Sequence, residues 1–374
     1  MMINNREALE ELAQRLTRAT AIALDTEFLR ERTYRAELCL LQIADATGPL
    51  CVDPLAQADL SALQAALVGG TAVKVMHACR QDIEVLLPAV GFVAPVFDTQ
   101  IAAALTGMPA QIGYAELVRR VTGRELSKAH TRADWSRRPL SAEQLDYALD
   151  DVRYLLPIRE HLIAELTRLG RVPWLQEELA ALQDPADYAV DPDEAWLRIR
   201  SFKGLDADRS RLAQVLAAWR ERRADERNRP RGWILDDAVL RDIVVRVPRT
   251  VDELAALADM QPGFVKHNGA ELLGLIEAAR MPAVLPRVNS RGAPDPHKAA
   301  LVKKLASVHQ AVATELNLPP EILATGAISS SWRTAARTPR SCAVGDAKSS
   351  VSACAQRYDR CRISKLGERA IDGG

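Results

Sequence analysis

Two acidic residues at the end of a short apolar run constrain this chain more than any other feature. The run at residues 21–24 is followed by Asp-Thr-Glu-Phe at residues 25–28. Side chains alternate between the two faces of an extended strand, so Asp25 and Glu27 are expected on one face and Thr26 on the other. Neighbouring carboxylates raise each other's pKa unless a cation or a proton compensates, which favours a hard divalent metal ion. Such a pair is also common at an ordinary solvated strand end, so distant residues must decide.

The length and composition describe a globular protein of several domains. A chain of 374 residues exceeds one ordinary core, and two or three domains are expected. A hydrophobic fraction of 48% excludes a mainly disordered chain, and the 49 basic and 49 acidic residues balance. Any basic surface for nucleic acid must therefore be local.

The chain lacks the marks of a membrane or secreted protein. It has no uncharged apolar stretch of about 18 residues, and its first residues do not form the apolar core of a signal peptide. Cys39, Cys51 and Cys79 lie in apolar runs, where a thiol packs as a small hydrophobic group. We expect a cytoplasmic protein with no contact with membranes, no disulfide and no zinc site.

Periodicity predicts a layered fold in the first half of the chain. Strands are expected over residues 21–28, 38–44, 49–52 and 72–77, and the turn at Gly48-Pro49 favours an antiparallel meander of the first three. Helices are expected over residues 6–18, 60–67, 81–87, 99–105, 114–121 and 141–169. Strands first, then strands alternating with helices, indicate a mixed sheet flanked by helices.

Two further segments carry candidate site residues. Asp82 is expected in the first turn of a helix that follows the strand over 72–77, pointing back toward the strand ends, although an acid there is often only a partner of the helix dipole. His77 is more typical of a strand end than of a metal ligand. Tyr147 and Asp151 are four residues apart on a helix and so share one face.

Together these segments resemble the ribonuclease D family of the DEDD exonuclease superfamily. The residues that carry the resemblance are Asp-Thr-Glu-Phe at 25–28, His-Ala-Cys-Arg-Gln-Asp at 77–82, Tyr147 with Asp151, and the run from Lys128 to Ser141. Four ordered segments are far more specific than any one of them. The resemblance implies an α/β ribonuclease H-like exonuclease domain with a mixed sheet flanked by helices, which we place at residues 1–185.

The branch of the superfamily follows from one position. The histidine-type branch needs a histidine five residues before the last aspartate, and Asp146 stands there. The chain therefore resembles the tyrosine-type branch, which points toward RNA processing rather than replication.

The resemblance also implies a mechanism. Asp25, Glu27, Asp82 and Asp151 would hold two Mg²⁺ or Mn²⁺ ions, with Asp25 bridging both ions and Asp82 supporting the second one through water. Tyr147 would orient the attacking water, because a phenol with a pKa near about 10 is a poor general base.

Three residues are candidates for substrate contact. Phe28 is expected at the terminal nucleotide, and Trp135 and Arg138 are expected to stack on a base and to contact phosphate. For Trp135, a role as a packing anchor is an equally good interpretation.

The second half of the chain predicts helices. A linker or helix is expected over residues 186–209, and the segments Leu-Ala-Ala-Trp-Arg at 216–220 and Asn-Arg-Pro-Arg-Gly-Trp-Ile-Leu at 228–235 resemble the HRDC domain, which we place at 210–290. Residues 291–325 look like a partial second HRDC-like domain. From residue 326 to 374 the apolar period stops, and we expect a disordered tail from a shifted reading frame or a replaced C-terminus.

The helical region is locally basic. A cluster of this kind binds phosphates or forms only a solvated face, and we favour contact with RNA. Its basic residues are Arg198, Arg200, Lys203, Arg209, Arg211, Arg220, Arg222, Arg223, Arg227, Arg229 and Arg231.

These observations predict a monomeric, metal-dependent 3′–5′ exoribonuclease that releases nucleoside 5′-monophosphates from RNA 3′ ends, with tRNA precursors and other structured RNA as partners. Two alternatives stay open. One is a DNA-directed exonuclease of the type joined to RecQ helicases, and the other is a non-catalytic RNA-binding module. The sequence favours catalysis, because all four acids and Tyr147 are present.

Overall fold

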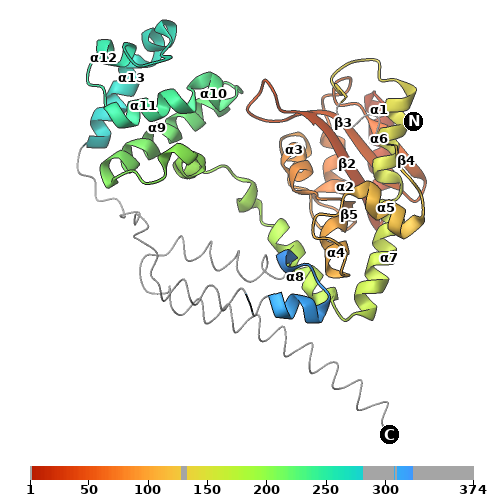
Figure 1. Cartoon of the computed structure of the whole chain (residues 1–374). Coiled ribbons are helices and arrows are strands. Elements are labelled where there is room, and N and C mark those ends of the chain that lie inside the picture. The colour runs from red at the N-terminus through yellow and green to blue at the C-terminus, as the bar shows by residue number, and fades with distance from the viewer. Residues whose placement is uncertain (1, 128–132, 281–306, 308–309, 323–374) are drawn as a thin grey trace. The chain divides into compact units, whose positions relative to one another are not determined.

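The structure is a computed structural model that describes residues 2–127, 133–280, 307 and 310–322 (Figure 1). Its contacts divide the chain into two compact units. Among the described residues, the first contains 2–27, 38–127, 133–185, 307 and 310–322, and the second contains 28–37 and 186–280. The assignment of Phe28–Glu37 to the second unit was not expected, because no local sequence pattern distinguishes this segment from its neighbours.

A six-stranded mixed sheet forms the centre of the first unit. Its order is β1-β4-β3-β2-β5-β6. Strands β3 and β4 pair antiparallel, whereas β1 pairs parallel with β4, β2 with β5, and β5 with β6. Strands β2, β3 and β4 are neighbours in the order that a meander requires. The strands are β1 (Met2–Ile3), β2 (Ala21–Leu29), β3 (Glu37–Asp45), β4 (Gly48–Val52), β5 (Val73–Met76) and β6 (Val96–Asp98).

The four expected strands are present, and β1 and β6 were missed. Both missed strands are too short to show an alternating pattern, since β1 has two residues and β6 has three. Each lies at one edge of the sheet and is held by a parallel partner far away in the chain, such as Met2 opposite Cys51. The sequence around them therefore carries no local signal.

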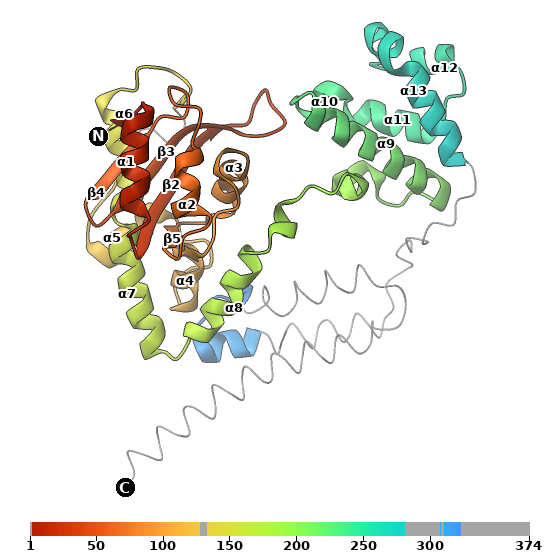
Figure 2. The ribbon, with the colours of Figure 1, turned by 180° about the vertical axis from the view of Figure 1, so that it is seen from behind.

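Helices cover both faces of this sheet (Figures 1 and 2). One face presents Ala23, Ala44, Val75 and Phe97 to a core that includes the helices α4, α5, α7 and α8. Alternation sends Ile22 and Leu24 to the other face, where both are fully buried. The helices of the first unit are α1 (Arg6–Leu16), α2 (Gln64–Leu67), α3 (Arg80–Val90), α4 (Thr99–Leu105), α5 (Tyr114–Thr122), α6 (Ala142–Arg153), α7 (Leu155–Arg168) and α8 (Val172–Leu182).

The prediction of one long helix over residues 141–169 is wrong. The structure has two helices, α6 and α7, that meet at Tyr154, which caps the end of α6 and the start of α7. Pro157 lies in the first turn of α7 and cannot continue an earlier helix, because its ring clashes with the carbonyl group four residues before it. Because α6 and α7 are separate helices, α6 can take a direction different from that of α7, and it packs against β4.

Residues 310–322 pack into the core of the first unit. Ala313, Leu316, Leu318 and Ile322 are buried in the same core as α4 and α7, and Arg171 donates a hydrogen bond to the Leu316 carbonyl at 2.7 Å. The rest of the expected partial second HRDC-like domain at 291–325, and the whole tail at 326–374, lie outside the described residues.

Residues 186–280 of the second unit are mainly helical and pack around a core of their own. Trp196, Leu216, Leu240 and Leu272 are members of that core. Its helices are α9 (Ala207–Glu226), α10 (Arg231–Ile234), α11 (Asp237–Arg246), α12 (Val251–Ala255) and α13 (Pro262–Arg280), preceded by short 3₁₀ turns at Pro192–Arg198 and Arg200–Phe202. Across the described residues, every helix is too short or too polar to span a bilayer.

Candidate active site

Three carboxylates meet near the C-terminal end of the internal strand β2 in the first unit. Asp25 and Glu27 lie on β2, and Asp151 lies on α6, which packs against β4. One carboxylate oxygen from each of the three lies within 4.8 Å of the others, and all three side chains are half-buried. Alternation along β2 places the first two acids on one face, and the helix supplies the third. Three acids with no basic group in the set form a natural binding site for a hard cation.

Asp82 lies beside this group and is not a member of it. It lies in the first turn of α3, as the sequence predicted, and it is only 7% exposed. Thr26 Oγ1 donates a hydrogen bond to Asp82 Oδ1 at 2.5 Å. Thr26 lies between Asp25 and Glu27 and points to the opposite face of β2, so the fourth acid is held from that side.

Asp98 fixes the loop that presents Asp82, a role that was not predicted from the sequence. Its carboxylate accepts hydrogen bonds from the backbone N–H groups of Ala78 and Cys79, at 3.1 and 2.9 Å, just before α3 begins. The same side chain caps α4 through Gln100 and Ile101. Asp-Thr at 98–99 matches the usual pattern of a helix start, but nothing local indicates the bonds to the distant loop.

The acids are strongly perturbed by burial and by one another. Burial, followed by repulsion from Asp82, Asp151 and Glu27, raises the pKa of Asp25 well above its ordinary value. Burial and the charge of Asp151 raise the pKa of Glu27 to about 8. Burial beside Asp150 raises the pKa of Asp151 to about 7, and burial raises that of Asp82 to about 6. Without a cation, the site therefore retains protons near neutral pH.

Tyr147 lies one turn before Asp151 on the same helix, as the spacing predicted. It is half-buried, and its ring centroid lies 6.1 Å from that of Trp135, with the ring planes at 31°. Trp135 is only 3% exposed. Its burial favours the packing interpretation over the stacking contact with a base that we also considered. Phe28 lies half-buried on β2, and its expected contact with the terminal nucleotide stays a prediction.

The geometry of Arg138 does not favour the expected phosphate contact. All five N–H donors of its guanidinium group are used within the protein. Nε and Nη2 bind the two oxygens of Asp53 at 2.7 and 2.8 Å, and Nη2 also donates to the Cys39 carbonyl at 2.7 Å. Nη1 donates to the carbonyl groups of Trp135 and Arg137, both at 2.8 Å. Local sequence could not reveal this, because Asp53 lies 85 residues away.

A second tyrosine supports α6 and was also missed. The Tyr114 hydroxyl donates to the Asp150 carbonyl at 3.0 Å, one residue before Asp151. Burial and the charge of Asp151 raise the pKa of Tyr114 above its ordinary value, so the hydroxyl keeps its proton. The ring of His77 lies 5.6 Å from the Tyr114 ring, and its two nitrogens lie near Thr99 Oγ1 and the Ile112 carbonyl. His77 is thus a structural residue, as expected.

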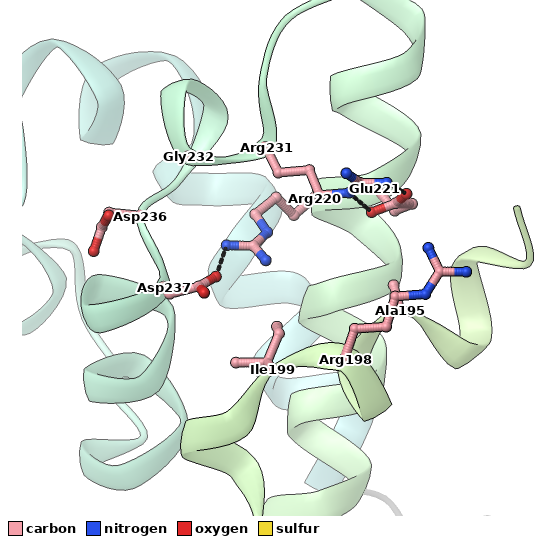
Figure 3. A pocket seen from close by; sticks show the side chains of 9 residues that line it. All are labelled: Ala195, Arg198, Ile199, Arg220, Glu221, Arg231, Gly232, Asp236 and Asp237. Carbon is pink, nitrogen blue, oxygen red and sulfur yellow. Dashed lines mark hydrogen bonds and ion pairs between the residues drawn. The ribbon is translucent and has the colours of Figure 1, made fainter. Parts of the chain in front are cut away.

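Six of the basic residues expected to form an RNA surface are in ion pairs, and Figure 3 shows two of these pairs, Arg220 with Asp237 and Arg231 with Glu221. The burial of Arg220 corrects part of the expected surface. Arg220 is 4% exposed, pairs with Asp237 at 2.6 Å and donates to the Leu235 carbonyl. Its burial follows from its position on α9 four residues after Leu216, on the apolar face. The paired arginines are Arg209 with Asp206, Arg211 with Asp208, Arg220 with Asp237, Arg222 with Asp193, Arg223 with Glu271, and Arg231 with Glu221.

Comparisons with known proteins agree with this geometry. The family described as 3′-5′ exonuclease matches residues 1–167, and the HRDC domain family matches residues 209–276. The chain is 40% identical over 283 residues to ribonuclease D of Acidiphilium cryptum, covering 75% of this chain and 72% of that protein. It is 41% identical over 296 residues to ribonuclease D of Zymomonas mobilis subsp. mobilis, covering 78% and 76%. The chain belongs to the ribonuclease D family.

Solved structures support the same assignment. The structure of Escherichia coli RNase D, described as an exoribonuclease involved in structured RNA processing, matches with a TM-score of 0.79 and 33% identity over 87% of this chain and 88% of that one. The catalytic core of RRP6 from Trypanosoma brucei matches with a TM-score of 0.57 and 26% identity, covering 74% and 79%. The protein is a 3′–5′ exoribonuclease with the fold expected from its sequence, and the resemblance to the ribonuclease D family is confirmed.

Exonucleases of this family depend on divalent metal ions, and the acids of this chain fit such a cofactor. Asp25, Glu27 and Asp151 offer three oxygens in one small group, and their raised pKa values mark negative charge that nothing in the group compensates. Because the folded protein then binds more protons than the unfolded chain between about pH 4 and 8, its stability without metal falls as pH rises through that range.

Metal affinity should therefore rise with pH. A cation displaces the protons that Glu27 and Asp151 hold, so each displaced proton adds up to about tenfold in affinity per pH unit between pH 6 and 8. Calorimetric titration with Mn²⁺ at pH 6, 7 and 8 measures this. The Glu27→Gln variant is the control, since removing one titrating carboxyl group should weaken binding and flatten the slope. An affinity that is constant from pH 6 to 8 would contradict the proton competition.

Proposed function

We propose that Asp25, Glu27 and Asp151, with Asp82 beside them, form the catalytic site and hold two Mg²⁺ or Mn²⁺ ions. The protein would act as a cytoplasmic monomer that removes nucleoside 5′-monophosphates from RNA 3′ ends. The observation that carries this proposal is the meeting of the three carboxylates within 4.8 Å, with Tyr147 one turn away on the helix of the third.

The metal ions supply the electrophilic chemistry when bound, by neutralising the phosphate and lowering the pKa of a bound water. The chain's own residues do the rest. Asp25 and Glu27 would hold the cations from β2, Asp151 would hold them from α6, and Asp82 would support this binding from α3. The hydroxyl of Tyr147 donates a hydrogen bond that orients the attacking water, and Phe28 contacts the terminal nucleotide.

Two observations support RNA over DNA as the substrate. The E. coli enzyme with 33% identity is described as processing structured RNA. This chain also has Tyr147, which is typical of the tyrosine-type branch of the superfamily rather than of the histidine-type branch. We infer that precursors of tRNA and other RNAs with a free 3′ extension are the substrates. Because carboxylates and metal ions do not read the 2′-hydroxyl, DNA remains the alternative to be tested.

Incubation with a 3′-extended tRNA precursor and with DNA of the same sequence tests this function. With Mg²⁺, the RNA should shorten stepwise from its 3′ end and release nucleoside 5′-monophosphates, and EDTA or Asp25→Asn should abolish release. Light scattering on the same preparation should give 41.0 kDa. Release in EDTA would contradict the metal site, faster cleavage of DNA would favour the DNA-directed alternative, and binding without release would leave an RNA-binding module.

Tyr147→Phe tests the orienting role of the hydroxyl. The variant keeps the ring and its contact with Trp135 and removes only the oxygen. We expect kcat to fall by roughly 10²–10⁴-fold, as for other positioned catalytic groups, with KM for RNA little changed. Single-turnover rates at saturating enzyme separate this loss from binding. A loss confined to KM would make Tyr147 a substrate contact instead.

A further inference from the structure

A buried ion pair joins the end of a central strand to the loop before α6. Asp53 directly follows β4 and is 3% exposed, and the Arg138 side chain is 24% exposed. Two parallel N–H···O bonds of 2.7 and 2.8 Å link them, which is the strong bidentate form of this pair. Burial alone would raise the pKa of Asp53, but the hydrogen bonds and charge of Arg138 outweigh it and hold the pKa below its ordinary value.

The same guanidinium group also binds the backbone of two segments. Besides Asp53, it binds the Cys39 carbonyl on β3 and the carbonyl groups of Trp135 and Arg137. Loops on a protein surface are usually mobile, but three donors of Arg138 tie this loop to β3 and to the residue after β4, and its other two donors bind the loop's own backbone. The position of Trp135 relative to the sheet is therefore fixed by this residue.

Trp135 carries that constraint to the site. Its indole ring is buried and lies 6.1 Å from the ring of Tyr147. Three residues after Arg138, Ser141 caps α6 through a capping box with Gln144, so the tied loop also sets where the helix begins. The helix then carries Tyr147 and Asp151 to the acids of β2.

We propose that Asp53 and Arg138 are positioning residues for the reaction, which hold Trp135 as the wall that sets the place of the Tyr147 hydroxyl. The proposal rests on the water-orienting role proposed for Tyr147. Misplacing a catalytic group by about an ångström costs up to about 10²-fold in rate without weakening substrate binding. A pair that acts on the hydroxyl should therefore change kcat and leave KM alone.

The fold offers a matched control. Asp45 ends β3, is 8% exposed, accepts a hydrogen bond from Arg15 at 2.8 Å and also accepts bonds within its own turn, as Asp53 does. This pair joins α1 to the C-terminal end of β3, whereas Cys39 lies near the N-terminal end of that strand. Asp53→Asn and Asp45→Asn each break one buried pair of the same unit, so comparing them separates loss of stability from loss of position.

The experiment measures kcat, KM and melting temperature for Asp53→Asn, Asp45→Asn, and Asp53→Asn combined with Tyr147→Phe. We expect Asp53→Asn to lower kcat by roughly 10- to 100-fold with KM unchanged, while Asp45→Asn keeps kcat at a similar loss of melting temperature. In the Tyr147→Phe background, Asp53→Asn should lower kcat little further, because the group that it positions is gone.

Three results would overturn the proposal. They are a normal kcat in Asp53→Asn, an equal fall of kcat in both backgrounds, or a higher KM at unchanged kcat, which would return Arg138 to substrate contact. If Asp53→Asn does not fold, Trp135→Phe is the second variant, because it keeps the ion pair and shortens the side chain that packs against Tyr147. A normal kcat in Trp135→Phe would also overturn the proposal. A normal kcat in Tyr147→Phe alone would refute the orienting role of the hydroxyl. That result differs from a normal kcat in Asp53→Asn, which would refute only the positioning role of Asp53 and Arg138.

Discussion

Repulsion among buried carboxylates is the constraint on which the rest of this structure depends. One carboxylate oxygen of each of Asp25, Glu27 and Asp151 lies within 4.8 Å of the others, and burial together with like charge raises the pKa values of all three acids above their ordinary values. A fold relieves such repulsion by separating the acids, by protonating them or by binding cations. This chain holds them together, so their spacing is maintained against an electrostatic cost that a divalent metal offsets.

The scaffold resists this repulsion with contacts from three directions. Strand β2 fixes two acids through its own alternation, and Thr26 between them holds Asp82 from the opposite face. Asp98 fixes the loop before α3, and the Tyr114 hydroxyl binds the backbone of α6 next to Asp151. These partners are Thr26 within β2, Asp98 at the end of β6 and Tyr114 at the start of α5, and all three are buried or half-buried.

Local spacing predicted the parts of the site that depend on one element. The alternation of a strand placed Asp25 and Glu27, and the turn of a helix placed Tyr147 over Asp151. The parts that join distant segments were missed, because Asp53 meets Arg138 only after the sheet and α6 have packed. Two errors were avoidable. Pro157 already broke the long helix, and the four-residue step from Leu216 already placed Arg220 on the buried face of α9.

Anomalous diffraction from crystals soaked in Mn²⁺ tests whether these acids bind catalytic cations. We expect anomalous peaks bounded by carboxylate oxygens of Asp25, Glu27 and Asp151, with a further ion close enough for Asp82 to support it through water. Peaks only elsewhere, or none at saturating Mn²⁺ and pH 8, would show that these acids do not form the cation site.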